Sequence, residues 1–337
     1  MKGRAVSILA ALGATLGWLA AAGCAASEDE RTVTNVPDGS LVGDTSTIVK
    51  DDGGTPGPTG KSVFYVHTEK TLYEIDPLDK TLALKKLGDV DCMNGGDPAK
   101  ADSSLTDIAV SRDGQVYGVS SRFAYELEVQ SGTVHCKNTW TISKEGSDSV
   151  FYGLTFAPIG TLSATEEVLI AANNDGQMYT LDQTTGKTTY VGNFGSDPKT
   201  KNKWNLSGDI VFLENNGNPI GFATVNACAP GKTCTVSDSL IELDVKAIKP
   251  GASSTLKGVR GQLVKGSWCT TKNNVSTFDK MFGIVAYEDR VFGFSDSGYI
   301  VEISNIDGSA CLITNNTGMK FKGAGIATSA PVVAVPN

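Results

Sequence analysis

The sequence has little of what usually marks an active site. It contains only two histidines, His67 and His135, among 337 residues. The motifs HExxH and GxSxG and the P-loop motif are absent, which excludes the enzyme classes that they mark. No two cysteines have CxxC spacing, so we expect no zinc site of the finger type. These absences favour a protein that binds over one that catalyses, and we expect no cofactor.

Positive charge is also scarce. The chain has 29 Lys and Arg residues against 37 Asp and Glu residues, which gives a formal net charge of −8. Nucleic acids are polyanions, and a negative field disfavours their binding. We therefore expect no nucleic-acid partner.

Long hydrophobic runs are missing except at the N-terminus. Lys2 and Arg4 precede the uncharged residues 5–22, which are mostly Ala, Leu, Ile, Val and Gly. A basic start followed by an apolar run is typical of an export signal, and we assign residues 1–23 to it. The sequence that follows turns polar and acidic at once, which disfavours a transmembrane helix.

The end of this run predicts lipid attachment. Ala21-Ala22-Gly23-Cys24 resembles the lipobox of bacterial lipoproteins, in which small residues precede a cysteine that receives a diacylglyceryl group. The resemblance implies that the lipid on Cys24 anchors the chain in a membrane of the cell envelope. Ala25, rather than Asp, follows the cysteine, which in that family implies the outer membrane. The alternative is an ordinary secretory signal with an unmodified cysteine.

Three further regions follow the signal. Residues 24–60 are rich in Ser, Thr, Asp, Gly and Pro, and they contain too little apolar surface to offset the cost of ordering. We expect a disordered tether there. Residues 61–333 read as one all-β domain, and residues 334–337 as a C-terminal tail.

The all-β prediction rests on an internal repeat. No amphipathic helix of three turns interrupts the domain. Each repeat opens with Gly or Asp, then an aliphatic residue, then a small or β-branched residue, and we expect the aliphatic residue to be buried. The five openings are Asp107-Ile108-Ala109, Gly153-Leu154-Thr155, Asp209-Ile210-Val211, Gly283-Ile284-Val285 and Gly325-Ile326-Ala327.

The third strand of each repeat alternates apolar and polar residues. Such alternation is typical of a strand that is buried on one side only. We expect its acidic residues to lie on a face that is solvated or that pairs with loops, namely Glu74, Glu126, Glu242 and Glu302.

Four strands per repeat resemble the blades of a β-propeller, and five openings imply five blades. The chain enters the pattern at a second strand near Ser62 and ends on a first strand near Gly325. The C-terminal strand would then join the N-terminal blade and close the ring, which removes open sheet edges. The pattern is similar to the divergent propellers of bacterial surface lipoproteins. Six blades, a β-sandwich and a β-solenoid are the alternatives.

The cysteine count supports export. With Cys24 set aside for lipid, six cysteines remain, and an even set in an exported chain predicts three disulfides. Two pairs would link neighbouring blades and one would close a short loop, giving Cys92–Cys136, Cys269–Cys311 and Cys228–Cys234.

Asp107 and Asp209 are the candidate site residues. They occupy matching positions in two repeats where the other repeats carry Gly, and we expect them near the mouth of a central channel. Two carboxylates there could act as acid and base in glycoside hydrolysis or bind Ca²⁺. Alternatively, they accept hydrogen bonds from backbone N–H groups. The acidic loop from Asp89 to Asp97 could also bind Ca²⁺, but it lacks EF-hand spacing, and we favour a loop that is simply held by a disulfide at Cys92.

We therefore expect a non-enzymatic, lipid-anchored scaffold whose loops and central funnel bind a protein or a carbohydrate. The alternative is a glycan-processing hydrolase that uses Asp107 and Asp209.

Overall fold

The computed structural model describes residues 62–93, 101–143, 150–227 and 237–332. The chain divides into two units, residues 1–54 and 55–337, and every described residue lies in the second. The predicted signal, Cys24, the whole tether, the C-terminal tail and the Cys228–Cys234 pair lie outside the described residues. None of the described helices is long and apolar enough to cross a membrane.

The described chain is all-β, as predicted, and contains 20 strands and two short 3₁₀ helices, η1 (Asp91–Met93) and η2 (Val245–Ala247). Three sheets consist of four consecutive antiparallel strands each. They are β8 (Phe151–Ala157), β9 (Val168–Asn173), β10 (Gln177–Leu181) and β11 (Thr188–Asn193); β12 (Asn205–Leu213), β13 (Ile220–Asn226), β14 (Ser239–Leu243) and β15 (Leu256–Gln262); and β16 (Gly283–Tyr287), β17 (Arg290–Phe294), β18 (Tyr299–Ser304) and β19 (Ala310–Asn315).

The fourth sheet has eight strands in the order β20-β1-β2-β3-β7-β6-β5-β4. A short parallel pairing between β3 and β7 joins its two halves, with Asp89 opposite Thr133 and Val90 opposite Val134. Its strands are β1 (Phe64–His67), β2 (Thr71–Ile75), β3 (Lys85–Val90), β4 (Asp107–Val110), β5 (Val116–Val119), β6 (Phe123–Gln130), β7 (Thr133–Thr141) and β20 (Gly323–Gly325).

The two ends of the described chain meet in this sheet. β20 pairs antiparallel with β1, so that Gly325 lies opposite Tyr65 and Gly323 opposite His67. The last strand therefore supplies the inner edge of the sheet that the first strand begins, as the phase of the repeat predicts.

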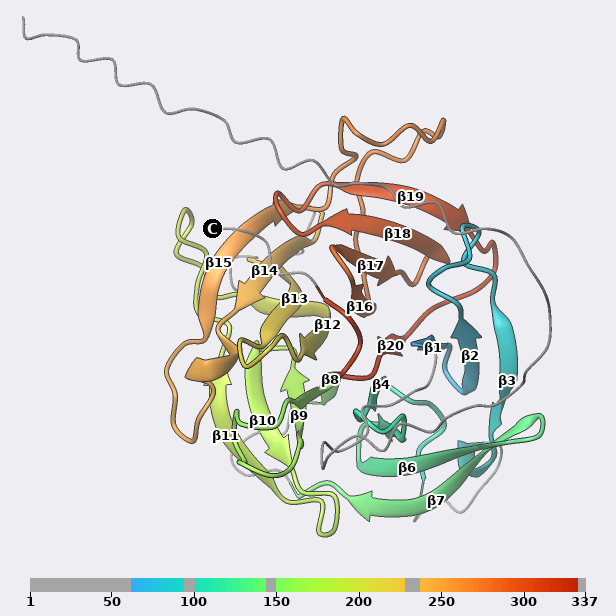
Figure 1. Cartoon of the computed structure of the whole chain (residues 1–337), viewed down its shortest axis with the longest axis vertical. Helices are drawn as coiled ribbons and strands as arrows, with labels where there is room; N and C mark the ends of the chain where they lie inside the picture. Colours follow the sequence, from blue (N-terminus) through green and yellow to red (C-terminus); the bar gives the residue numbers. More distant parts are fainter. Residues whose placement is uncertain (1–61, 94–100, 144–149, 228–236, 333–337) are drawn as a thin grey trace, which may run out of the picture. The chain divides into compact units, whose positions relative to one another are not determined.

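The sheets radiate from a common centre in a propeller-like arrangement (Figure 1). The innermost strands β4, β8, β12, β16 and β20 each contact the next, and β20 contacts β4. Apolar side chains fill the layers between sheets: the Phe64 and Phe292 rings lie 5.1 Å apart, and those of Tyr117 and Phe156 lie 5.4 Å apart. The five aliphatic residues of the repeat openings are at most 4% exposed, so their predicted burial is confirmed: Ile108, Leu154, Ile210, Ile284 and Ile326.

Glycine allows the inner strands to approach one another. A Cβ on Gly208 of β12 would lie 1.5 Å from the carbonyl oxygen of Met281. A Cβ on Gly283 of β16 would lie 2.7 Å from the carbonyl carbon of Gly323 in β20. Side chains cannot fit at these positions, so the backbones themselves pack together near the centre.

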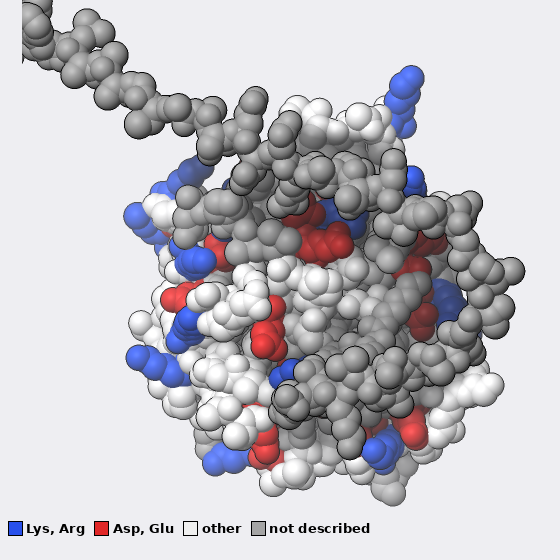
Figure 2. Space-filling model, in the orientation of Figure 1, with Lys and Arg blue, Asp and Glu red and all other residues white. Residues whose placement is uncertain are grey.

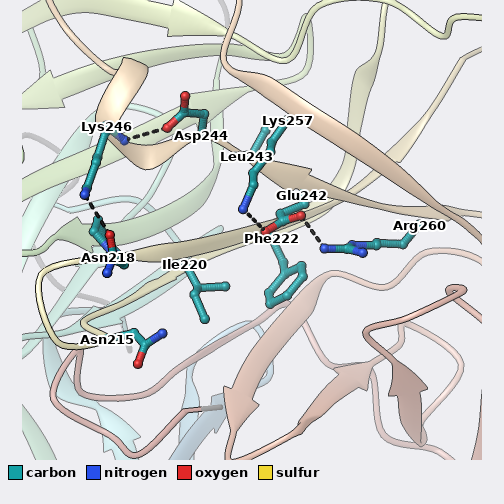
Figure 3. A pocket seen from close by; sticks show the side chains of 11 residues that line it. Asn215, Asn218, Ile220, Phe222, Glu242, Leu243, Asp244, Lys246, Lys257 and Arg260 are labelled. Atoms are coloured by element: carbon teal, nitrogen blue, oxygen red, sulfur yellow. Dashed lines mark hydrogen bonds and ion pairs between the residues drawn. The ribbon is translucent and has the colours of Figure 1, made fainter. Parts of the chain in front are cut away.

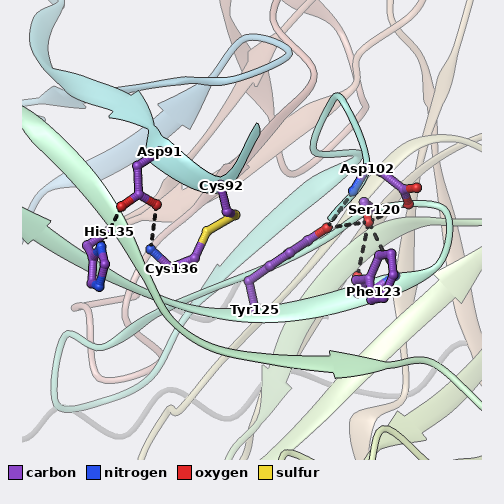
Figure 4. The surroundings of a disulfide bond; sticks show 8 residues. All are labelled: Asp91, Cys92, Asp102, Ser120, Phe123, Tyr125, His135 and Cys136. Carbon is purple, nitrogen blue, oxygen red and sulfur yellow. Dashed lines mark hydrogen bonds and ion pairs between the residues drawn. A yellow bond between two sulfur atoms is a disulfide. The ribbon is translucent and has the colours of Figure 1, made fainter. Parts of the chain in front are cut away.

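Disulfides join Cys92 to Cys136 and Cys269 to Cys311, with Cα atoms 6.0 Å and 5.1 Å apart. These are the two described pairs that the strand layout predicts. The first lies where η1 contacts β7 (Figure 4). Disulfides persist in oxidising compartments, so the two bonds indicate an exported protein.

Candidate functional site

The two candidate carboxylates do not lie at a channel mouth, contrary to our expectation. Asp107 and Asp209 are both 0% exposed. Asp107 Oδ2 accepts a hydrogen bond from the Leu154 N–H, which links β4 to β8. Asp209 Oδ2 accepts one from the Ile284 N–H at 2.9 Å, which links β12 to β16. Each carboxyl group therefore bridges two neighbouring inner strands. The position of the two residues in the sequence could not indicate that they are fully buried.

Burial controls the protonation of this pair. It raises the pKa of Asp107 well above its ordinary value, and the nearby charge of Asp209 raises that pKa further. Burial also raises the pKa of Asp209, to about 8, although hydrogen bonds partly oppose the shift. A carboxyl group in this setting holds its proton at neutral pH, because the dry interior penalises the charged form.

The sequence gives no signal for a third central residue, His67. This histidine is fully buried, and its Nδ1 lies 2.6 Å from the Thr68 carbonyl oxygen, to which it can only donate. Within the described residues, His67 Nε2 and Asp107 Oδ1 have no hydrogen-bond partner. Both flank Gly323, where a Cβ would lie 2.4 Å from Nε2 and 2.0 Å from Oδ1. Burial lowers the pKa of His67 to about 4, so the ring is neutral and Nε2 is an acceptor.

A cavity of about 740 Å³, which we call the funnel, lies at the end of the ring where the inner strands begin. Thr106, Phe282 and Lys322 line it immediately before β4, β16 and β20. Each sheet, or a loop beside it, contributes residues to the lining. The other lining residues are Glu69, Ser104, Leu105, Ser121, Tyr152, Asn174, Asp175, Asn205, Leu206, Ser207, Asn226 and Lys280.

Neutral hydrogen-bonding groups dominate the funnel lining. Asparagine amides and serine hydroxyls come from five separate segments of the chain. Tyr152 adds an aromatic side chain that is 39% exposed. Lys280 and Lys322 are balanced by Glu69 and Asp175. This combination suits a compact, uncharged or weakly charged ligand with many hydroxyl groups.

Contacts behind the lining fix parts of the funnel wall. Lys322 Nζ lies 2.9 Å from Asp296 Oδ1 and 5.3 Å from the centre of the Phe282 ring. Ser207 Oγ donates to the buried Asp238, whose Oδ2 also accepts from the Met281 N–H at 3.0 Å. Burial raises the pKa of Asp238 to about 6. Side chains held in this way lose little freedom when a ligand binds.

The C-terminal segment after β20 lies at the opposite end of the ring. The Thr328 carbonyl accepts from the Glu214 N–H at 2.8 Å, and Ser329 Oγ donates to the Arg112 carbonyl at 3.2 Å. The Glu288 N–H donates to the Pro331 carbonyl at 2.6 Å. The segment therefore connects turns of three sheets at the end of the ring away from the funnel.

Glu242 of β14 is not on a solvated face, contrary to our expectation, because it is only 6% exposed. Its carboxylate lies between Lys257 and Arg260 of the neighbouring strand β15 (Figure 3). The two cations compensate the cost of burying the charge. The corresponding Glu74 and Glu126 also pair with lysines, at 3.4 Å and 2.8 Å, but are more exposed.

The loop proposed for Ca²⁺ uses its described acids in hydrogen bonds. Asp89 accepts from Thr71 Oγ1 at 2.7 Å. Asp91 accepts from the Cys136 N–H at 3.0 Å and from His135 (Figure 4). Asp97 lies outside the described residues. Within the described part of the chain, one group of three neighbouring residues has side chains of the kinds that bind metals, namely Asp91, Cys92 and Cys136. Its two sulfur atoms are joined in the disulfide.

Charge on the surface is mixed. On the described part of the face shown in Figure 2, acidic and basic side chains are interspersed without a large area of one sign. A polyanion would need a continuous basic surface, and this face does not offer one.

No family model and no curated protein matches this chain. Among solved structures, it resembles a protein of unknown function from Bacteroides caccae at 9% identity and a TM-score of 0.39, covering 80% of this chain and 99% of that one. A symmetrical protein from a study of de novo evolutionary emergence gives 14% identity and a TM-score of 0.38, covering 80% and 100%. A chain of the mitotic checkpoint complex gives 11% and 0.34, covering 82% and 74%. Similarities this weak support no conclusion about function.

Proposed function

We propose that this chain is an exported lipoprotein, anchored through Cys24, whose five-bladed propeller binds a carbohydrate in the funnel without catalysing a reaction. The disulfides support export, and the lipobox-like sequence ending in Cys24 supports the anchor. We assign the anchor to the outer membrane because Ala25 follows the cysteine.

The sheet topology supports five blades. Three sheets have four strands each, and the eight-stranded sheet divides at the parallel β3–β7 pairing into two groups of four. One of these groups takes its inner strand, β20, from the C-terminus. The closed succession of contacts from β4 through β8, β12, β16 and β20 back to β4 agrees with a ring of five.

The funnel carries the functional proposal. Its volume of about 740 Å³ falls within the range of roughly 300–1,000 Å³ that is usual for small-ligand sites. Protein partners usually bind to broader and flatter surfaces. Amides, hydroxyls and one exposed tyrosine converge on a single hollow, which favours a sugar over a protein as the ligand.

Glycan binding by the purified full chain tests the proposal. We expect saturable binding to at least one envelope-type glycan, and we expect Tyr152→Ala to weaken it about tenfold through loss of the aromatic contact. Trp268→Ala is the matched control, because Trp268 is also an exposed aromatic, at 42%, but does not line the funnel. Equal affinities for the Tyr152 variant and the unaltered chain would contradict the funnel as the site.

The hydrolase alternative is tested in the same samples. Because Asp107 and Asp209 are fully buried and do not line the funnel, we expect binding without turnover. Glycan cleavage that disappears in Asp107→Asn would overturn the proposal.

A further inference from the structure

A second cavity, of about 230 Å³, opens on the β12–β15 sheet and shares no lining residue with the funnel. Ile220 and Phe222 form its apolar wall (Figure 3). Glu242, Lys257 and Arg260 line it beside the phenyl ring. Lys246 lines it as well, on the far side, where its Nζ lies 2.9 Å from Asn218 Oδ1.

Glu242 divides its carboxylate between two cations. Oε1 accepts from Lys257 Nζ at 2.9 Å, and Oε2 accepts from Arg260 Nη2. A guanidinium commonly holds a carboxylate through two parallel N–H bonds. Here the second bond is missing, because the buried Nε of Arg260 has no hydrogen-bond partner in the described part of the chain. Arg260 therefore keeps an unused donor in the wall of the cavity, where its Nε is itself buried.

The lining also carries an excess of positive charge. Lys246, Lys257 and Arg260 are cations, whereas only Glu242 and Asp244 are anions. One positive charge remains in a chain whose formal net charge is −8. Lys246 and Lys257 are exposed and Arg260 is paired with Glu242, so this excess is a positive charge at the opening of the cavity that attracts an anionic ligand.

We propose that this cavity binds a small carboxylate with a short apolar group. Lys257 and Arg260 bind its oxygens, because the planar guanidinium matches a carboxylate. Ile220 and Phe222 contact its apolar group. The volume of about 230 Å³ suits a small organic acid, and a phosphate ion would leave the apolar wall unused.

Titration calorimetry of the full chain with sodium isobutyrate tests this site, with sodium chloride at equal ionic strength as the blank. We expect saturable binding that is about tenfold tighter than that of acetate, because isobutyrate buries two more carbon atoms. Inorganic phosphate should bind more weakly than isobutyrate. Affinity for phosphate equal to that for isobutyrate, or no advantage over acetate, would overturn the assignment of the ligand class.

Variants identify the residues that bind the anion. Lys257→Gln and Arg260→Gln should each weaken isobutyrate binding about tenfold. Lys257 is half exposed, so we expect Lys257→Gln to fold. This variant therefore tests the site even if Arg260→Gln does not fold. Glu242→Gln should tighten binding, because the internal carboxylate no longer competes for the two cations.

Lys249→Gln is the matched control, since Lys249 is an exposed lysine near the same sheet that does not line the cavity. Its affinity should equal that of the unaltered chain. If the three residues serve only as a structural ion-pair cluster, the variants will change the melting temperature but no isobutyrate binding will be measured, and the proposal will be wrong.

Discussion

At the scale of single residues, the buried centre lacks a hydrogen-bond donor unless one carboxyl group is neutral. His67 Nε2 is an acceptor because Nδ1 donates to the Thr68 carbonyl. Asp107 Oδ1 lies beside Gly323, as His67 Nε2 does, and it can donate a hydrogen bond only when it carries a proton. The fully buried Asp209 nearby also opposes ionisation of Asp107. We therefore expect Asp107 to be protonated in the native state.

Asp107→Asn tests this protonation state, because an amide reproduces a neutral acid. Its Oδ1 can accept from the Leu154 N–H, as the carboxyl group does, and its Nδ2 is a donor like the O–H of a protonated carboxyl. We expect the free energy of unfolding at pH 7 to change by less than about 1 kcal/mol, whereas Asp107→Ala should cost about 2–3 kcal/mol through unsatisfied polar groups. Urea unfolding measures both. If Asn costs as much as Ala, Asp107 is ionised in the native state.

The same groups predict a pH dependence. The raised pKa values of Asp107 and Asp209 mean that the native state holds protons that the unfolded chain releases above its ordinary pKa of 3.8. Their stabilising contribution is complete below that value and is lost as the pH rises through the native pKa, about 8 for Asp209. His67 acts in the opposite direction between its ordinary value of 6.5 and about 4, where stability falls with falling pH.

Above pH 6.5 only the carboxyl pair contributes among these three groups. We therefore expect the free energy of unfolding to decrease from pH 6.5 through pH 8, and Asp209→Asn to flatten the slope. Asp182→Asn is the control, because hydrogen bonds from Thr184 and Thr185 lower the pKa of this exposed carboxyl. An unchanged slope in Asp209→Asn would show that the buried pair is not its source.

At the scale of strands and sheets, close backbone packing at the centre needs glycine at particular positions. Gly208→Ala in β12 would place a methyl group 1.5 Å from the Met281 carbonyl oxygen, so β12 and β16 would have to separate. We expect a loss of about 3 kcal/mol or more, comparable with severe overpacking. Gly258→Ala in β15 of the same sheet should be nearly neutral, because nothing lies within 4 Å of its added Cβ. Thermal unfolding that shifts equally for both would contradict the packing described here.

Sequence patterns predict the elements well and their surroundings poorly. The repeat openings and the alternating strands identify the sheets, and the strand layout pairs Cys92 with Cys136, because these features depend on local periodicity. Depth within the ring depends on how sheets pack, so Asp107 was expected at a mouth but lies in the centre. Glu242 was expected on a solvated face, but Lys257 and Arg260 on the next strand allow its burial.

The funnel could not be predicted residue by residue for a similar reason. Its lining comes from strand ends and loops of every sheet, which share no sequence pattern. Asn174, Asn226 and Tyr152 are far apart in the chain and meet only because the ring brings the ends of the sheets together. The repeat predicts a central funnel, whereas the residues that line it can be identified only from the structure.

At the scale of the whole molecule, the ring depends on its last strand. β20 pairs with β1 and contacts both β16 and β4, so it completes one sheet and closes the circle of inner strands. Without it, β1 would present an unpaired edge, and the apolar residues on both sides of the gap would be exposed. Closure by β20 is therefore the feature on which the funnel and the buried centre both depend.

Truncation tests this closure most directly. A chain that ends at Lys322 lacks β20, whereas a chain that ends at Val332 keeps it and loses only the last five residues. Thermal unfolding followed by circular dichroism should show a cooperative transition for the longer chain and none for the shorter one. A cooperative transition at the same temperature in both chains would contradict a ring that is closed by pairing of β20 with β1.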